Sequence, residues 1–321
     1  MLNLFALQSG GLMRQSTGAL GTALWIDLLE PSPEEERHVE SELGIDVPTR
    51  EEMREIESSN RLFEEDGAVY LTATIVTKLD TSLPQNSQVT FILKDGRLIT
   101  NRYTDPLPFR RFASYAERHG NACASGSAVL AGLVEALVNR VADVIERVSA
   151  DLDSISAEVF TRPSGRRRGA QRDFRAVLER VGQSGELIGK TRESLVSLGR
   201  ALAFAQQSTA LALTNDVRTR YRTLSRDIIA LSDHASFLGS NVSFILDATL
   251  GMISIDQNNI LKIFSVVTVF LLPPSVIGAI FGMNFEHMPW LHAQWGFPVA
   301  LCLMVASAVI PYVIFKRRGW L

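Results

Sequence analysis

Two uncharged apolar runs near the C-terminus constrain this chain more than any other feature. They span Ile263–Phe281 and Phe297–Phe315. Each holds about 19 residues, enough for a helix rising 1.5 Å per residue to cross roughly 30 Å of hydrocarbon. The sequence therefore predicts a transmembrane domain over residues 258–321, with spans at about 262–282 and 296–315.

The remainder of the chain has the composition of a soluble protein. The 321 residues carry a net charge of −3, which gives no reason to expect nucleic acid as a partner. Cys123 precedes the spans and Cys302 lies inside the second, so no disulfide framework is predicted and a cytoplasmic location fits the soluble part. Residues 1–20 lack the pattern of a signal peptide. No nucleophile–base pair emerges, so we expect neither an enzyme nor an organic cofactor.

Residues 1–121 predict an α+β domain, a mixed sheet covered by helices. Asp95-Gly96 is a strong hairpin signal between the last two predicted strands. Ser32-Pro33 opens one helix with an N-cap and a proline in the first turn, and Thr49 opens a second. The β-rich segments are residues 23–28, 68–76, 88–93 and 97–103.

Residues 122–257 predict long helices with coiled-coil-like seams. Apolar residues recur at spacings of three and four in three segments, and the segment at Thr161–Gly169 interrupts the first seam. No proline occurs from Val217 to Leu272, so we predict one very long helix that continues into the first span. Pro273-Pro274 should bend that span and free one or two carbonyls.

Basic residues fix the expected orientation. Lys262 begins the first span, and Lys316, Arg317 and Arg318 end the second, whereas residues 286–294 contain no Lys or Arg. The positive-inside bias therefore predicts both termini in the cytoplasm and the short loop outside.

Polar residues are concentrated in the first span and at its ends. They are Asn258, Ser265, Thr268, Ser275 and Asn284. One interpretation is that the hydroxyls bond back to their own helix or join neighbouring helices. The other is a water-filled path, and two spans cannot enclose one, so several copies would have to form a ring.

The segment Phe281–Pro289 (FGMNFEHMP) resembles the CorA family of divalent-cation channels. Asn258 with Lys262, the double proline and the basic C-terminal end extend the resemblance over essentially the whole chain. The resemblance implies a funnel-shaped homopentamer in the inner (plasma) membrane whose pore is lined by the first span. It also implies uptake of Mg²⁺, with Co²⁺ and Ni²⁺ often tolerated.

The resemblance assigns roles to individual residues. Asn284 matches the outer selectivity ring, shaped by Gly282 and Met283. Two positions depart from the family pattern: Trp290 stands where Glu is frequent, which leaves Glu286 as the only acid in the outer loop, and Phe281 stands where Tyr is common. The expected pore-lining residues are Asn258, Leu261, Ser265, Leu272 and Ser275, the two leucines being candidate constrictions.

Family members close when cytoplasmic Mg²⁺ fills acidic sites between subunits. The candidates here are Glu55, Asp227 and Asp233, and the alternative is that they are ordinary solvated acids. Two other functions stay open at this point: a Zn²⁺ transporter of the ZntB type, and a membrane-anchored scaffold or sensor. Met283 favours Mg²⁺, because ZntB-type relatives commonly depart from the Gly-Met-Asn motif at its middle residue.

Overall fold

The structure is a computed structural model that describes residues 1–8, 10–15, 20–55, 57–79, 83–161, 173–283 and 293–318. It divides into two compact units, Met1–Leu246 and Asp247–Leu321, and α6 contributes residues to both. The strands are β1 (Leu2–Gln8), β2 (Gly11–Gln15), β3 (Trp25–Leu29), β4 (Leu62–Glu65), β5 (Ala68–Thr77), β6 (Gln85–Lys94) and β7 (Arg97–Arg102). The helices are α1 (Pro33–Leu43), α2 (Ser58–Arg61), α3 (Leu107–Ala116), α4 (Gly126–Phe160), α5 (Phe174–Gln207), α6 (Asn215–Phe281) and α7 (Gly296–Arg317).

The first unit is built on one mixed sheet, as the sequence predicted. Its strand order is β2-β1-β3-β7-β6-β5-β4, and of these neighbours only β3 and β7 run parallel. Asp95 and Gly96 form the β6–β7 turn with φ angles of 48° and 74°, the left-handed conformation that a tight hairpin requires. The four predicted strands correspond to β3, β5, β6 and β7.

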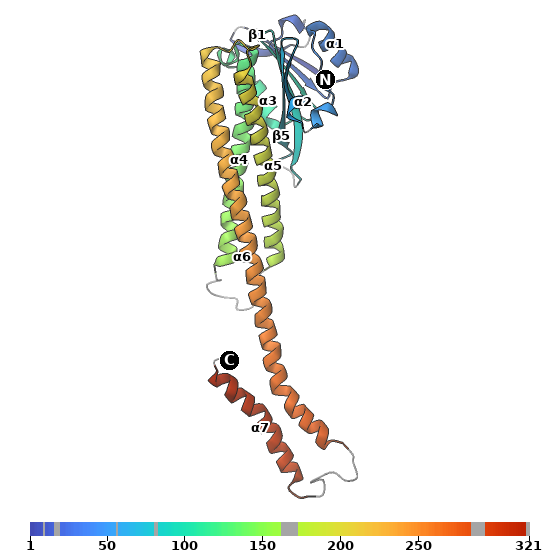
Figure 1. The fold of residues 1–321 in the computed structure, drawn as a ribbon, viewed down its shortest axis with the longest axis vertical. Coiled ribbons are helices and arrows are strands. Elements are labelled where there is room, and N and C mark those ends of the chain that lie inside the picture. Colours follow the sequence, from blue (N-terminus) through green and yellow to red (C-terminus); the bar gives the residue numbers. More distant parts are fainter. Residues whose placement is uncertain are drawn as a thin grey trace. The chain divides into compact units, whose positions relative to one another are not determined.

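Helices cover both faces of this sheet (Figure 1). On one face, Ile26, Tyr70 and Ile99 pack with Val39 of α1. On the other face, Trp25 meets Phe112 of α3 with ring centroids 5.7 Å apart, and Phe91 stacks on Phe109 at 6.4 Å. Strands buried on both faces carry near-continuous apolar runs, and every residue of β5 is buried.

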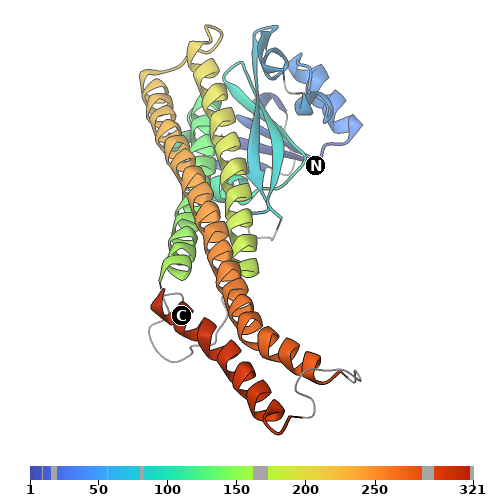
Figure 2. The same cartoon turned by 60° about the horizontal axis from the view of Figure 1, so that its bottom comes forward.

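Three long helices complete the first unit and lie side by side (Figures 1 and 2). The predicted seams are buried: Leu152 and Ile155 of α4 and Tyr221 of α6 are all 0% exposed. Tyr221 also donates its hydroxyl to the carbonyl of Ser127 at 3.0 Å, which ties α6 to the start of α4. α6 has 67 residues, so the prediction of one very long helix is confirmed.

The short helix predicted at Thr49 takes the form of a 3-10 turn rather than an α-helix. A 3-10 turn forms over Glu52–Arg54, and a separate short helix, α2, follows at Ser58. Thr49 and Glu52 form a reciprocal pair at the start of this turn: Thr49 Oγ1 accepts from the backbone N–H of Glu52 at 3.4 Å, and the Glu52 carboxylate accepts from the backbone N–H of Thr49 at 2.8 Å. By contrast α1 begins as predicted, with a complete capping box between Ser32 and Glu35.

Gly126 sits where α4 touches the β6–β7 hairpin. Its N–H donates to the carbonyl of Gly96 at 2.6 Å, and a β-carbon would lie 2.3 Å from the backbone carbon of Arg97. We expect Gly126→Ala to destabilise the protein by about 3 kcal/mol, because backbone cannot yield as a side chain can. Gly182→Ala on α5 is the control, since a β-carbon there meets nothing within 4 Å. Thermal unfolding of both variants provides the measurement, and a Gly126→Ala protein as stable as wild type would contradict this packing.

Candidate functional site on the first membrane span

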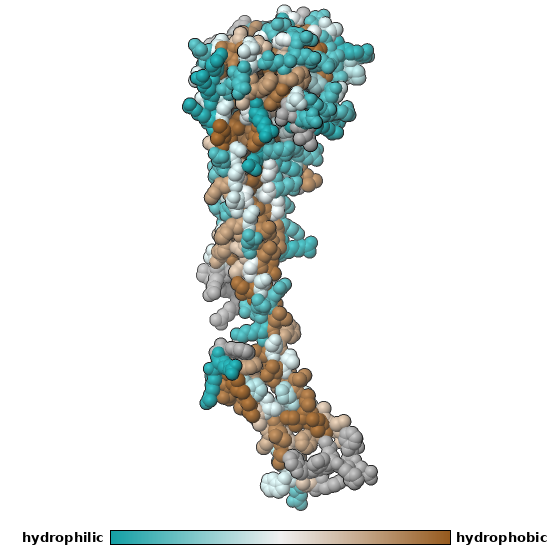
Figure 3. Space-filling model, in the orientation of Figure 1, coloured by the Kyte–Doolittle hydropathy of each residue, from teal (hydrophilic) through white to brown (hydrophobic). Residues whose placement is uncertain are grey.

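In the described part of the chain, two helices are long and apolar enough to cross a membrane, the C-terminal part of α6 and α7. The most apolar stretch of α6 has none of its residues buried in the single chain. Figure 3 shows hydrophobic side chains over much of the visible surface of both segments. Such a surface needs lipid or other protein around it.

α7 packs along one face of the α6 span. The ring of Phe270 lies 6.1 Å from that of Tyr312 and 6.3 Å from that of Phe315. A β-carbon on Gly278 would lie 2.8 Å from Met304 Cε, so the two helices approach closely there. The half-buried residues of the α6 span are Val266, Val269, Phe270, Pro273, Pro274, Ile277, Gly278 and Phe281.

The predicted pore-lining residues share a different face of α6. They are Asn258, Leu261, Ser265, Leu272 and Ser275; Thr268 falls on the same face, and all six residues are exposed and recur at spacings of three and four. At 3.6 residues per turn this polar stripe covers an arc of about 100°, centred roughly 160° away from the half-buried face that meets α7. Every hydroxyl residue of the run Ile263–Phe281 lies on the stripe.

The stripe hydroxyls bond to their own helix. Ser265 donates to the carbonyl of Leu261 at 2.8 Å, Thr268 to that of Phe264 at 2.8 Å, and Ser275 to that of Leu271 at 2.7 Å. This is the interpretation that the sequence offered for Thr268. Each hydroxyl oxygen nevertheless keeps acceptor capacity, because a hydroxyl has one proton and two lone pairs.

Pro273 and Pro274 lie within α6, and the helix continues past both to Phe281. Proline has no N–H, so the carbonyls four residues before them, those of Val269 and Phe270, lose their usual helical donors. The bend expected there stays a prediction.

The span ends at the predicted entrance. The N–H of Gly282 donates to the carbonyl of Gly278 at 2.9 Å, and the Met283 side chain is 48% exposed. Asn284 and Glu286, together with Trp290, lie outside the described residues.

The three acids proposed as regulatory ligands are all exposed. Glu55 follows the 3-10 turn and accepts a hydrogen bond from the amide of Asn60. Asp227 and Asp233 lie on α6, and among the described residues neither forms a salt bridge. No group of three or more His, Cys, Asp or Glu side chains that could hold a metal occurs in the described part of the chain. One chain by itself therefore does not assemble these acids into a metal site.

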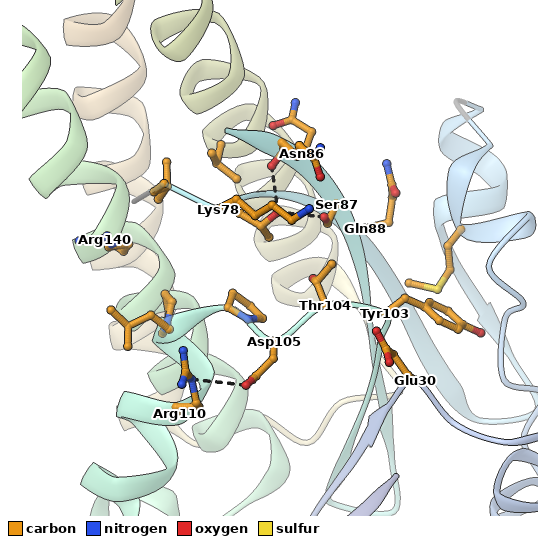
Figure 4. Close-up of a pocket in the computed structure, with 18 of the residues that line it drawn as sticks. Glu30, Lys78, Asn86, Ser87, Gln88, Tyr103, Thr104, Asp105, Arg110 and Arg140 are labelled. Atoms are coloured by element: carbon orange, nitrogen blue, oxygen red, sulfur yellow. Dashed lines mark hydrogen bonds and ion pairs between the residues drawn. The ribbon is translucent and has the colours of Figure 1, made fainter. Parts of the chain in front are cut away.

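A hollow of about 900 Å³ in the first unit is not suited to a cation either (Figure 4). Glu30 and Asp105 are its acidic lining residues, and Asp105 pairs with Arg102 at 3.0 Å and Arg110 at 3.4 Å. The basic lining residues are Arg50, Arg54, Lys78, Arg110 and Arg140. This excess of positive charge would repel a divalent cation.

Comparison with known proteins gives consistent results along the whole chain. The family model described as "CorA-like Mg2+ transporter protein" matches residues 21–317. The magnesium transport protein CorA of Haemophilus influenzae and that of Escherichia coli K12 are each 34% identical, with 100% of this chain and 100% of theirs covered. The CorA magnesium transporter of Methanocaldococcus jannaschii has a similar fold, with a TM-score of 0.77 at 18% identity over 100% of this chain and 99% of that one.

Proposed function

The chain belongs to the CorA family of Mg²⁺ transporters, and on that basis we propose that it is a channel-type transporter that takes up Mg²⁺ along the polar stripe of α6. The stripe is the observation that carries the proposal. The hydroxyls of an otherwise apolar span lie on one face, and α7 packs on another. Exposing these hydroxyls to lipid would be energetically unfavourable. A ring of identical copies would instead turn them toward a shared axis. A homopentamer with a cytoplasmic funnel is the assembly that the family resemblance implies.

The stripe chemistry suits an ion that keeps its waters. Mg²⁺ dehydrates reluctantly, and the waters around it point their hydrogens outward. A pore wall for such an ion needs hydrogen-bond acceptors. Ser265, Thr268 and Ser275 already donate their protons to helix carbonyls, so they offer acceptor oxygens toward the axis.

The entrance and the constrictions complete the proposed path. A ring of Asn284 amide oxygens, shaped by Gly282 and Met283, would bind the hydrated ion without stripping its waters. Carboxylates in that ring would hold the ion more tightly and slow its release. Leu261 and Leu272, which are 62% and 59% exposed in the single chain, would close the path by excluding water.

The membrane potential is sufficient to drive uptake. With both termini in the cytoplasm of a cell whose inner membrane is negative inside, each positive charge gains about 2.3 kcal/mol per 100 mV. A Mg²⁺ ion therefore gains about 4.6 kcal/mol per 100 mV, and no ATP is required. Co²⁺ and Ni²⁺, which have the same charge, would gain the same energy.

Ion uptake by the reconstituted full-length protein tests the proposal. Liposomes with an inside-negative potential should accumulate Mg²⁺ at a rate that rises with the potential, whereas protein-free liposomes should not. The same preparation is then given Co²⁺, Ni²⁺ and Zn²⁺. Uptake of Zn²⁺ in clear preference to Mg²⁺ would favour the ZntB-type function, and absence of any uptake would favour a scaffold or sensor.

We further propose that cytoplasmic Mg²⁺ closes the channel by bridging Glu55, Asp227 and Asp233 between subunits. Their exposure and the lack of salt bridges at the two aspartates support this, because such carboxylates repel one another until a cation joins them. Glu55→Gln, Asp227→Asn and Asp233→Asn should each shift inhibition to higher internal Mg²⁺. Asp216→Asn, an exposed acid at the start of α6, is the control. Unchanged inhibition in a variant would remove that residue from the gate.

A further inference from the structure

A second hollow in the first unit, of about 460 Å³, lies between α5 and β5. β4 pairs with β5 from Ala68 to Leu71, so from Thr72 onward this edge of β5 has no strand partner among the described residues. α5 takes the place of a strand here: the N–H of Thr74 donates to Ser197 Oγ at 2.8 Å. The hollow therefore opens where a strand edge meets a helix.

Positive charge dominates its lining. Arg61, Arg192 and Arg200 line it, and among the described residues that line it Glu193 is the only acid. Glu193 is partly engaged elsewhere, because it accepts a hydrogen bond from the Asn86 amide at 2.6 Å. Arg192 and Arg200 are eight residues apart on α5, which puts them on the same helix face.

Arg61 has a buried donor that lacks an acceptor. Its Nη2 donates to Thr74 Oγ1 at 2.7 Å, whereas its Nε is buried and has no hydrogen-bond partner among the described residues. Burial lowers the pKa of the Arg61 guanidinium from its ordinary value; the carboxylate of Glu193 opposes the change and the charge of Arg200 adds to it. A buried unpaired donor in a positively charged hollow calls for an anion.

We propose that this hollow binds a phosphate group, with Arg61 Nε and the guanidinium groups of Arg192 and Arg200 as its donors. The Ser197 hydroxyl accepts from the strand edge and keeps its own proton to donate. Gly189, also in the lining, leaves open space where a side chain would stand. The phosphate group comes either from inorganic phosphate or from a nucleotide. This site does not depend on the transport function proposed above.

Calorimetric titration of the full-length protein in detergent with inorganic phosphate, at constant ionic strength, tests the proposal. We expect one saturable site per chain and at least a tenfold weaker affinity in Arg61→Gln. Arg175→Gln is the matched control, because it removes an exposed positive charge from α5, outside the hollow. No saturable binding by the wild type, or equal binding by all three proteins, would overturn the proposal.

A second variant and a second readout guard against a folding defect in Arg61→Gln. Arg200 is exposed, so the Arg200→Gln protein should fold normally. It should nevertheless bind phosphate more weakly than the wild type does. Phosphate should also raise the Tm of the wild type more than chloride does at equal ionic strength, and this difference should shrink in Arg200→Gln. An unchanged difference would count against the site. Displacement of phosphate by ATP would identify a nucleotide as the source, and its absence would identify free phosphate.

Discussion

Asn284→Ala is expected to abolish selective Mg²⁺ uptake while leaving the assembly intact. In the proposed entrance each copy contributes one amide oxygen, and an alanine methyl cannot accept a hydrogen bond from the waters around the ion. One such bond contributes about 1 kcal/mol. Losing two or three at once would therefore slow uptake by roughly 30- to 140-fold, which amounts to the loss of selective uptake, because each 1.4 kcal/mol is a factor of ten. Uptake into liposomes under a fixed inside-negative potential measures this loss.

Two controls make the result specific. Size-exclusion chromatography should give the same elution volume for Asn284→Ala and wild type, because a side chain at the mouth of the path does not hold the helices together. Ser307→Ala removes a hydroxyl from α7, where Ser307 donates to the carbonyl of Met304 at 2.7 Å. That variant should transport normally. Normal selective uptake by Asn284→Ala would refute the assigned filter.

The elements that the sequence predicted well are those whose signals are local. The N-cap at Ser32, the turn at Asp95-Gly96 and the seam through Leu152 and Ile155 each depend on residues a few positions apart, and all three formed. The length of α6 could be inferred from the lack of proline over a long interval. Its passage through Pro273 and Pro274 was predicted as well, because the uncharged run continues to Phe281 and a membrane helix tolerates proline where neighbouring groups satisfy the freed carbonyls.

The sequence did not predict β1, β4 or α3. These elements depend on partners far away in the sequence, or contain residues such as proline that fit either a loop or a helix. β1 contains Asn3, whose burial depends on its hydrogen bonds with Asp27 on β3, 3.2 Å away, and with Arg14 on β2. β4 is four residues long and is held by Phe63 stacking on Tyr70. α3 begins beside Pro106 and Pro108, which indicate a loop unless they occupy the first turn of a helix. No local period marks β1 or β4, whereas α3 carries Phe109, Phe112 and Ala116 at helical spacing, a signal that the two prolines obscured.

The candidate site likewise contains some residues that the sequence predicts and others that it cannot reveal. Periodicity alone groups Ser265, Leu272 and Ser275 on one face of the span, and it also adds Thr268, whose hydroxyl the sequence left undecided. The acids proposed to sense Mg²⁺ cannot be derived from a single chain. Carboxylates that meet across a subunit boundary leave no spacing signal, and Glu55 is far from Asp227 in sequence.

A large loss of folding stability is expected when Asp27 on β3 is replaced. Asp27 and Arg102 are 2% and 4% exposed and form a two-pronged ion pair, with Nε–Oδ1 and Nη2–Oδ2 distances of 2.8 Å. Thr100 also donates to the Asp27 carboxylate at 2.8 Å, and the Arg102 guanidinium lies 4.7 Å from the Phe109 ring centroid. This network joins β3, β7 and α3. Removing its only carboxylate on β3 would leave a buried guanidinium without a full counter-charge.

We therefore expect Asp27→Asn to destabilise the first unit by about 3–5 kcal/mol. For a unit of this size, that loss lowers the Tm by roughly 6–20 °C. Thermal unfolding of the full-length protein in detergent, followed by circular dichroism, gives the measurement. Glu179→Gln is the control: it breaks the exposed pair with Arg175, whose side chains are 62% and 89% exposed, and should change stability by less than about 1 kcal/mol.

The double variant Asp27→Leu/Arg102→Met separates the penalty of an unpaired charge from the net contribution of the pair. Replacing both partners by apolar side chains of similar size leaves no buried charge, so much of the lost stability should return. If the double variant were no more stable than Asp27→Asn, the shape and hydrogen bonds of the network would matter more than its charge balance. If Asp27→Asn itself unfolded at the wild-type temperature, the carboxylate would not be the counter-charge that holds Arg102 in the core.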